Sequence, residues 1–269
     1  MKWSAAVVVL MGIAATLAGA PPTGVSVSPK RVTLSPIDSI APVTVRNDGD
    51  AAVKLKLSVS AWTNDDDGRP VYSDSTDVEV APAALTIEPK SSAVVTLTAK
   101  NRPRGSEWAY RLFVDDAAAP AATPAPAASP SPAATPAPLP APTDERLFVP
   151  IFLRLGAAIG VPVVESLMVE GGEMLMVVRN IGSGAMLIQS AKIRGVSDGG
   201  RDVFETPLDG GYVLAQRRRV YHLPIDPAQC GKIRQVVGQV ATPETGAMRF
   251  AFVTPASCPA AAKAKSGIN

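Results

Sequence analysis

E-W-A-Y-R-L-F-V (residues 107–114) and R-L-F-V-P-I-F-L-R-L (residues 146–155) are the two segments that best indicate the fold of this chain. Both segments place apolar residues at alternate positions, which is typical of β-strands. The Ala/Pro tract between them, residues 117–143, has too few apolar groups to offset the entropy cost of ordering. We therefore predict two strands joined by a long disordered loop, with the second strand able to offer its edge to another chain.

The rest of the chain repeats this short alternating pattern between turn clusters rich in Asn, Asp and Gly. Strand and turn together recur about every ten residues, which is the spacing of a β-sandwich. The phrase V-T-V-R-N-D-G (residues 43–49) is echoed by M-V-V-R-N-I-G (residues 176–182) beyond the tract. No long segment has the apolar spacing of a helix. The sequence thus predicts an all-β protein with two homologous immunoglobulin-like sandwich domains.

The N-terminus has the pattern of a secretory signal peptide, which we assign to residues 1–20. Lys2 precedes an apolar run and a string of small residues, and cleavage would start the mature chain near Gly19. The run is too short to cross a bilayer, and no later segment reaches about 18 consecutive apolar residues. We expect a protein that is exported to the bacterial periplasm and is not embedded in a membrane.

The length of the chain limits the number of domains, and its net charge limits the kinds of partner. Without the signal peptide and the tract about 220 residues remain, enough for two domains of roughly 100 residues each. We place the N-terminal domain at residues 21–155, the C-terminal domain at 156–258 and a disordered tail at 259–269. The 26 basic and 24 acidic side chains give a net charge of only +2. This balance does not favour nucleic acid as a partner.

Catalytic and metal-binding motifs are missing from the sequence. It has a single histidine, His222, and lacks G-x-S-x-G, H-E-x-x-H and a glycine-rich phosphate loop. We predict that the protein is not an enzyme and uses no cofactor or metal.

The two cysteines, Cys230 and Cys258, lie close together near the end of the chain. In an oxidising compartment such a pair usually forms a disulfide, here closing a loop of about 29 residues. The alternative is a reactive or metal-binding pair, against which stand the absence of C-x-x-C and the single histidine.

Five segments, in this order behind a signal peptide, make the chain resemble the periplasmic chaperones of the chaperone-usher pilus pathway. They are V-S-P-K-R-V-T-L (27–34), V-T-V-R-N-D-G-D (43–50), V-A-P-A-A-L-T-I-E-P-K (80–90), E-x-x-Y-R-L-F-V (107–114), and N-x-G (180–182) combined with G-Y-V-L-A-Q-R-R-R-V-Y (211–221).

The resemblance implies two immunoglobulin-like domains in an L shape, no catalytic activity, and partners that are pilin subunits and an outer-membrane usher. Such chaperones lend the last strand of the first domain to a pilin that lacks a strand, a known form of recognition by strand addition. The P-I-F-L form of this strand is similar to the archaic branch of the family. The expected function is therefore to bind and stabilise pilin subunits and deliver them to the usher.

Strand 147–155 is the expected donor strand. Leu147, Val149, Ile151 and Leu153 share one face, which we expect to fill the pilin groove, while Phe148 and Phe152 would pack in the chaperone's own core. Pro150 lacks a donor, which suits an edge strand. The alternative is an ordinary core strand with both faces buried.

The resemblance also implies a basic pair between the domains that binds the C-terminal carboxylate of the pilin. Arg31 matches the first cation, and arginine suits the role because it binds carboxylates through two parallel hydrogen bonds. The usual lysine of the donor strand is absent, so Arg154 or Arg111 would supply the second charge. Alternatively, Arg31 is a solvated strand-edge charge, and Arg111 pairs with Glu107 or an interdomain acid.

A different class of function remains open at this point. The chain could be a secreted structural or adhesive protein in which the Ala/Pro tract is a spacer between two domains. The position of strand 147–155 separates the two hypotheses. It would begin the second domain in a spacer protein, whereas in a chaperone it would complete the first, which otherwise ends one strand short of a seven-strand sandwich.

Overall fold

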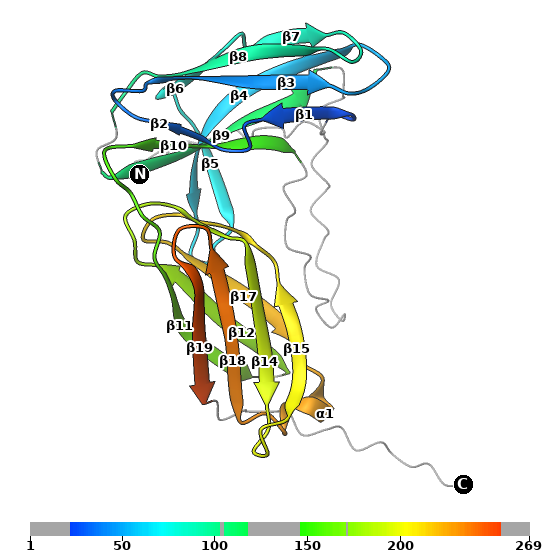
Figure 1. The fold of residues 1–269 in the computed structure, drawn as a ribbon, viewed down its shortest axis with the longest axis vertical. Coiled ribbons are helices and arrows are strands. Elements are labelled where there is room, and N and C mark those ends of the chain that lie inside the picture. The colour runs from blue at the N-terminus through cyan, green and yellow to red at the C-terminus, as the bar shows by residue number, and fades with distance from the viewer. Residues whose placement is uncertain (1–21, 103–104, 118–145, 171, 254–269) are drawn as a thin grey trace, which may run out of the picture.

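The computed structural model describes residues 22–102, 105–117, 146–170 and 172–253. They form two β-sandwiches whose long axes meet at a steep angle, so the molecule is L-shaped, as predicted (Figure 1). The expected signal peptide, the tail and nearly all of the Ala/Pro tract lie outside the described residues. No helix within these ranges has the length and apolar character needed to cross a bilayer.

The first domain consists of two packed sheets, one ordered β1-β3-β8-β6 and the other β2-β10-β9-β4-β5, with β7 also paired to β4. Its strands are β1 (Val25–Ser28), β2 (Val32–Leu34), β3 (Ile40–Asn47), β4 (Val53–Asn64), β5 (Pro70–Asp74), β6 (Val78–Ala81), β7 (Ala84–Ile87), β8 (Ser92–Ala99), β9 (Glu107–Asp116) and β10 (Leu147–Arg154).

The second domain packs the sheet β15-β14-β18-β19 against the sheet β11-β12-β17, with a small β13-β16 pair at one end. Its elements are β11 (Pro162–Glu170), β12 (Glu173–Asn180), β13 (Met186–Ile188), β14 (Ser190–Val196), β15 (Asp202–Leu208), β16 (Gly211–Val213), β17 (Arg218–Pro224), the short helix α1 (Pro227–Cys230), β18 (Gln235–Thr242) and β19 (Gly246–Val253).

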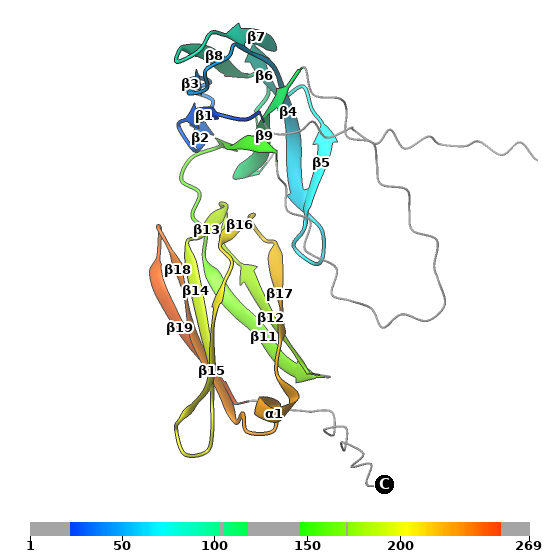
Figure 2. The same cartoon turned by 90° about the vertical axis from the view of Figure 1, so that its right-hand side faces the viewer.

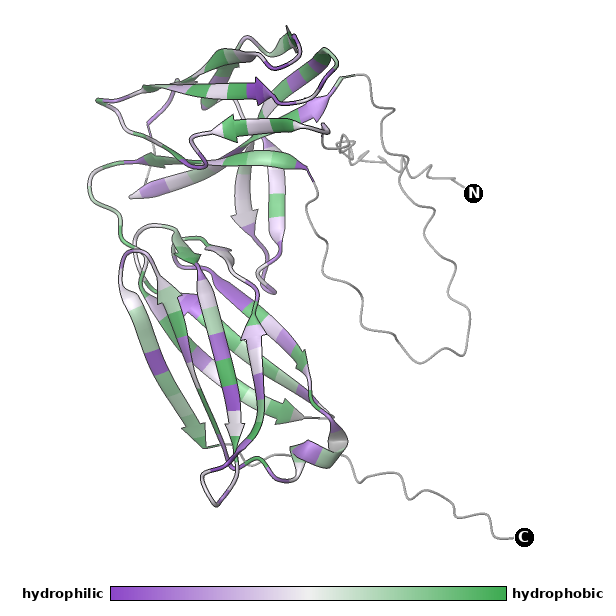
Figure 3. Ribbon diagram, turned by 45° about the vertical axis from the view of Figure 1, so that its right-hand side comes forward, coloured by the Kyte–Doolittle hydropathy of each residue, from purple (hydrophilic) through white to green (hydrophobic). Residues whose placement is uncertain are grey.

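Each sandwich has its own apolar core, because alternate residues of every inner strand point between the sheets. In β3, for example, Val43 and Val45 are fully buried while Thr44 and Arg46 point outward. Figure 3 shows this alternation of hydrophobic and hydrophilic residues along the strands of both domains. The predicted all-β fold of two sandwich domains is therefore confirmed.

The repeated phrase in the sequence marks the same structural device in both domains. Asn47 and Asn180 each end a strand, are fully buried, and donate from Nδ2 to three backbone carbonyls. Each also accepts from the glycine two residues later, Gly49 or Gly182. A buried amide with these bonds satisfied ties the strand end to a neighbouring loop.

Strand β10 lies in the first domain. It pairs antiparallel with β9 along its whole length, from Leu147 opposite Val114 to Arg154 opposite Glu107. Its second half also pairs in parallel with β2. The spacer hypothesis required this strand to begin the second domain, and the pairing contradicts it.

A long hairpin, β4–β5, reaches from the first domain to the second (Figure 2). At its tip the backbone carbonyl of Asp66 accepts from Arg218 Nε at 2.6 Å, and that of Asp67 accepts from the amide of Val220 at 3.3 Å. Gly68 is required there, because its φ is +84° and a Cβ would lie 2.6 Å from the carbonyl oxygen of Arg218. The hairpin thus braces one domain against the other.

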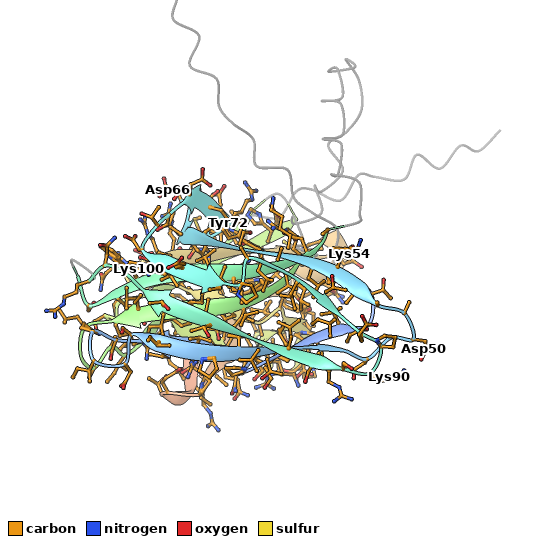
Figure 4. The ribbon with its side chains drawn as sticks, turned by 90° about the horizontal axis from the view of Figure 1, so that it is seen from above. Asp50, Lys54, Asp66, Tyr72, Lys90 and Lys100 are labelled. Atoms are coloured by element: carbon orange, nitrogen blue, oxygen red, sulfur yellow. The ribbon has the colours of Figure 1, made fainter. Side chains whose placement is uncertain are left out.

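Viewed from above, Asp66 and Tyr72 of this hairpin stand on one side of the first domain, away from Asp50 and Lys90 at its rim (Figure 4). Lys90 and Asp50 form a surface ion pair of 2.8 Å. Such an exposed pair contributes about 0–1 kcal/mol. The interdomain contacts of the hairpin are therefore more important for the shape of the molecule than this rim pair.

Candidate partner-binding site

Among the described residues, the candidate donor strand β10 is unpaired along half of one edge. Strand β2 covers that edge only at Ile151, Phe152 and Leu153. Residues 147–150 form no ladder with β2, and Pro150 has no backbone N–H to leave unpaired. The first half of β10 therefore has an edge at which another strand can add.

The face expected to enter a partner's groove is buried in the protein itself. Val149, Ile151 and Leu153 are 0% exposed in the core of the first domain, and Leu147 packs against the same core. This contradicts the predicted orientation of the strand. The physical reason is that β10 completes a sandwich, so one of its faces must cover the opposite sheet.

The opposite face of β10 carries Phe148, Pro150, Phe152 and Arg154, and the sequence predicts that its two aromatic rings lie in the first-domain core. Instead Phe152 is buried in a separate cluster with Trp62, Ala185 and Leu214, which joins the two domains. Phe148 is only partly buried and lies on the outer side of the sheet. The outer face is thus also largely covered in the free protein, because Pro150 and Phe152 are buried and Phe148 and Arg154 are partly buried. This arrangement is close to the alternative of a core strand with both faces covered.

Arg31 lies just before β2, at the junction of the two domains. Its Nη1 is 3.4 Å from Glu244 Oε1, in the turn between β18 and β19 of the second domain, and its side chain is 41% exposed. It also lies beside the hydroxyl of Tyr212. Burial raises the pKa of Tyr212, and Arg31 opposes that rise. The predicted first cation is therefore reachable and already holds a carboxylate.

Arg154 is engaged in a structural ion pair. Its Nε donates to Glu107 Oε2 at 2.5 Å, and the Glu107 side chain is only 2% exposed. The second oxygen of Glu107 accepts from the backbone amide of Ala185 in the second domain at 2.6 Å. Because removing either partner leaves a buried charge, Arg154 is better suited to holding the domains together than to binding a ligand.

Arg111 is surrounded by aromatic rings. Its guanidinium carbon lies 3.9 Å from the ring centre of Phe148, 4.1 Å from that of Trp62 and 5.2 Å from that of Tyr72, and Arg111 also donates to the Tyr72 hydroxyl. The residue is 7% exposed. Glu107, one of the acids considered as an alternative partner for Arg111, instead holds Arg154 and the amide of Ala185.

The three predicted arginines therefore do not form one cluster. Arg31 and Arg154 both act on Tyr212, whereas Arg111 lies among rings on the outer face of the first domain. Sequence reasoning missed Tyr212 and Glu244. Glu244 gave no signal, since a charged residue in a turn is ordinarily solvated, and Tyr212 was considered only as part of the motif at residues 211–221.

A cavity of about 350 Å³ lies at the junction of the two domains. Its walls come from β4, from β9, from Asp77 just before β6 and from the segment that joins β16 to β17, and they include Trp108 and Arg217. None of the three predicted arginines lines it. Its lining includes Glu107, which pairs with Arg154, and Trp62, whose ring contacts Arg111, so the cavity borders two of the candidate cations.

Two further expectations concern cysteines and metals. Cys230 is fully buried in the second-domain core, and Cys258 lies outside the described residues, so the pairing of the two stays a prediction. Across the described ranges, no group of three or more His, Cys, Asp or Glu side chains is arranged to hold a metal ion.

Residues 24–128 match the family model of the pili and flagellar-assembly chaperone, PapD N-terminal domain. The first domain belongs to this chaperone family. The matched range stops before β10, which the Ala/Pro tract separates from β9. The family consists of assembly chaperones and not of enzymes, and the resemblance read from the sequence is confirmed.

The solved structure of one pilus chaperone, YadV, shares the fold over most of the chain, and two others align with lower scores. The YadV chaperone has a TM-score of 0.53 at 13% identity, over 86% of this chain and 100% of that chain. A chain of the CsuC–CsuE chaperone–tip adhesion subunit complex from the archaic Csu pili of Acinetobacter baumannii has a TM-score of 0.46 at 19% identity, over 73% of this chain and 89% of that chain. The CupB2 chaperone of Pseudomonas aeruginosa has a TM-score of 0.45 at 14% identity, over 85% and 100%. No curated protein matches the sequence.

Proposed function

We propose that this protein is a periplasmic chaperone that binds pilin subunits through strand β10, stabilises them and delivers them to an outer-membrane usher. The observation that carries the proposal is the half-open edge of β10 in a domain of the pilus chaperone family. An added strand gains main-chain hydrogen bonds at that edge and side-chain contacts from the face beside it. The proposal includes export by the predicted signal peptide and a domain boundary near Leu155, supported by the pairing of β10 with β9.

The proposed orientation of the client follows from the two faces of β10. Since Val149 and Ile151 cover the chaperone core, a client strand at residues 147–150 meets the outer face, where Phe148 stacks near Arg111. This face presents the Phe148 ring and the Arg111 guanidinium. The ring can contact apolar side chains of a client strand, and the guanidinium can bind polar groups at its ends. The client's missing edge would then be completed without unfolding the first domain.

Arg31 is the proposed anchor for the C-terminal carboxylate of the client. Its side chain is the most exposed of the three predicted arginines, and its guanidinium holds the carboxylate of Glu244 in the free protein. A permanently charged guanidinium can exchange one carboxylate for another without a change in protonation. Arg154 and Arg111 would contribute through the positions of Glu107 and Phe148.

The test is co-purification from a periplasmic extract of cells that make pili, with a C-terminally tagged chain and mass spectrometry of the bound protein. We expect a pilin subunit at about a one-to-one ratio, lost in Arg31→Ala. Arg46→Ala is the matched control, because Arg46 forms a similar exposed ion pair with Asp48 far from the domain junction. A clean monomer from wild-type protein would contradict the proposed function. Retention of pilin by Arg31→Ala would contradict only the anchor.

A further inference from the structure

Two arginines flank β10, and both pair with carboxylates of β9. Arg146, just before the strand, forms a two-point contact with Asp115, with Nε 2.9 Å from Oδ1 and Nη2 2.6 Å from Oδ2. Arg154, its last residue, pairs with Glu107. The Arg146 and Asp115 side chains are only 17% and 12% exposed, and Arg146 also lies 3.7 Å above the ring of Phe113. The strand is therefore held by an ion pair at each end.

A turn of two to five residues fixes the register of most hairpins, but β9 and β10 are too far apart in the sequence to be joined by one. Residues 118–145 separate Ala117 from Arg146 in the sequence. Strand β2 contacts only residues 151–153, so β9 alone holds the first half of β10 in its ladder. Something other than a turn must select the register there.

The apolar core excludes slips by one residue. Such a slip would turn Val149, Ile151 and Leu153 from the core to the outer face. It does not exclude a slip by two residues, because the same apolar face then still points inward. The alternation of side chains cannot distinguish these two registers.

The end pairs exclude the slip by two. In one direction Arg146 would face Phe113 and Arg154 would face Gly105, and in the other they would face Ala117 and Ala109. Either shift removes both carboxylates at once. Partly buried charges without partners are costly, so the observed register is strongly selected.

We propose that the Asp115–Arg146 ion pair sets the register of strand β10 on β9, and that both are positioning residues for the donor strand. The Glu107–Arg154 pair holds the C-terminal end of β10, where β2 also pairs with the strand. The Asp115–Arg146 pair holds the N-terminal half, which β2 does not cover. This register places Phe148 opposite Phe113 and Pro150 opposite Arg111 on the outer face. The consequence for a client rests on the proposed function, since a shifted strand would present different side chains at the open edge.

Hydrogen exchange of the free protein tests the register without a client. In Asp115→Asn we expect the amides of residues 147–149 to exchange at least tenfold faster, while those of residues 151–153 stay protected by β2. Glu205→Gln, which breaks the exposed cross-strand pair with Lys192 in the second domain, is the matched control and leaves β10 unchanged.

A cross-link reports the register itself. Phe113→Cys with Phe148→Cys places two thiols at directly opposite positions, and we expect their disulfide yield to fall in the Asp115→Asn background. The charge-reversed variant, Asp115→Arg with Arg146→Asp, should restore both the yield and the protection, which a loss of packing alone would not allow. Arg146→Lys, which keeps the charge but loses the two-point geometry, is used if Asp115→Asn does not fold and should give an intermediate yield.

The outcomes separate the two proposals. Unchanged exchange and unchanged cross-linking in Asp115→Asn and Arg146→Lys would overturn the role of the pair in setting the register. If both change as expected and the charge-reversed variant restores them, the register role stands, and pilin capture is then measured on the same variants. Capture that is insensitive to the register would overturn the donor-strand function and leave the register-setting pair in place.

Discussion

Arg31 and Glu244 form an ion pair across the junction of the two domains, with 3.4 Å between Arg31 Nη1 and Glu244 Oε1. The two side chains are 41% and 26% exposed, so the pair contributes only about 0–1 kcal/mol to stability. In the free protein a carboxylate from the second domain thus lies where the proposed anchor would receive a carboxylate from a client. Because the pair is weak, an incoming carboxylate can replace it at little cost.

Glu244→Gln should strengthen client binding. Removal of the internal carboxylate spares the client the cost of displacing it, and a cost of up to about 1 kcal/mol corresponds to roughly a fivefold change in Kd. Titration of the variant with purified pilin measures the effect, and Glu79→Gln, which breaks an exposed pair with Lys100, is the control. Weaker binding by Glu244→Gln would show that Glu244 positions Arg31 instead of competing for it.

Substitutions on the two faces of β10 should have different effects. Ile151→Ala removes a fully buried side chain from the core and should lower the free energy of unfolding by about 2–5 kcal/mol. Phe148→Ala, on the outer face, should cost less stability and more client affinity. Denaturant unfolding and pilin titration of both variants check this. The reverse pattern would restore the original prediction that the Leu/Val/Ile face is the one offered to the client.

The predicted disulfide between Cys230 and Cys258 should be detectable in protein from the periplasm. Peptide mapping under non-reducing conditions should find the two cysteines in one linked fragment. Closing a loop of about 29 residues contributes roughly 3 kcal/mol, so Cys258→Ser should lower the melting temperature. Equal melting of the wild type with and without reductant would count against the disulfide.

Stability should fall in acid through Asp77. A hydrogen bond from Asn101 lowers the pKa of this carboxyl, burial opposes the effect, and bonds from Ser75 and Tyr110 add to the lowering. Because the pKa in the folded state lies below that in the unfolded state, the contribution is complete above the unfolded value and is lost as pH falls through the folded one. The stability of Asp77→Asn should therefore change less steeply than wild type below about pH 4. Unfolding by denaturant across that range gives both slopes, and parallel slopes would rule out this role of Asp77.

Predictions from the sequence were correct where a sequence pattern is compatible with a single local structure. The two Arg-Asn-turn phrases predicted a repeated domain, and Asn47 and Asn180 make the same set of bonds. Reasoning failed on the faces of β10 because both are apolar, so alternation showed that there are two faces but not which one meets the core. The aromatic surroundings of Arg111 could not be predicted, because Trp62 and Tyr72 are distant from it in the sequence.

The all-β class, the two sandwiches and the resemblance to pilus chaperones could be predicted from the sequence, since they follow from local periodicity, turn residues and the order of short motifs. The three-dimensional packing was needed to show which face of β10 covers the core of the first domain, that Glu244 pairs with Arg31 and that Asp115 pairs with Arg146. Each of these depends on which segments are neighbours in space. The packing of the opposite sheet or of the other domain determines which way a side chain points and which residue it contacts. Periodicity along one strand carries no information about either.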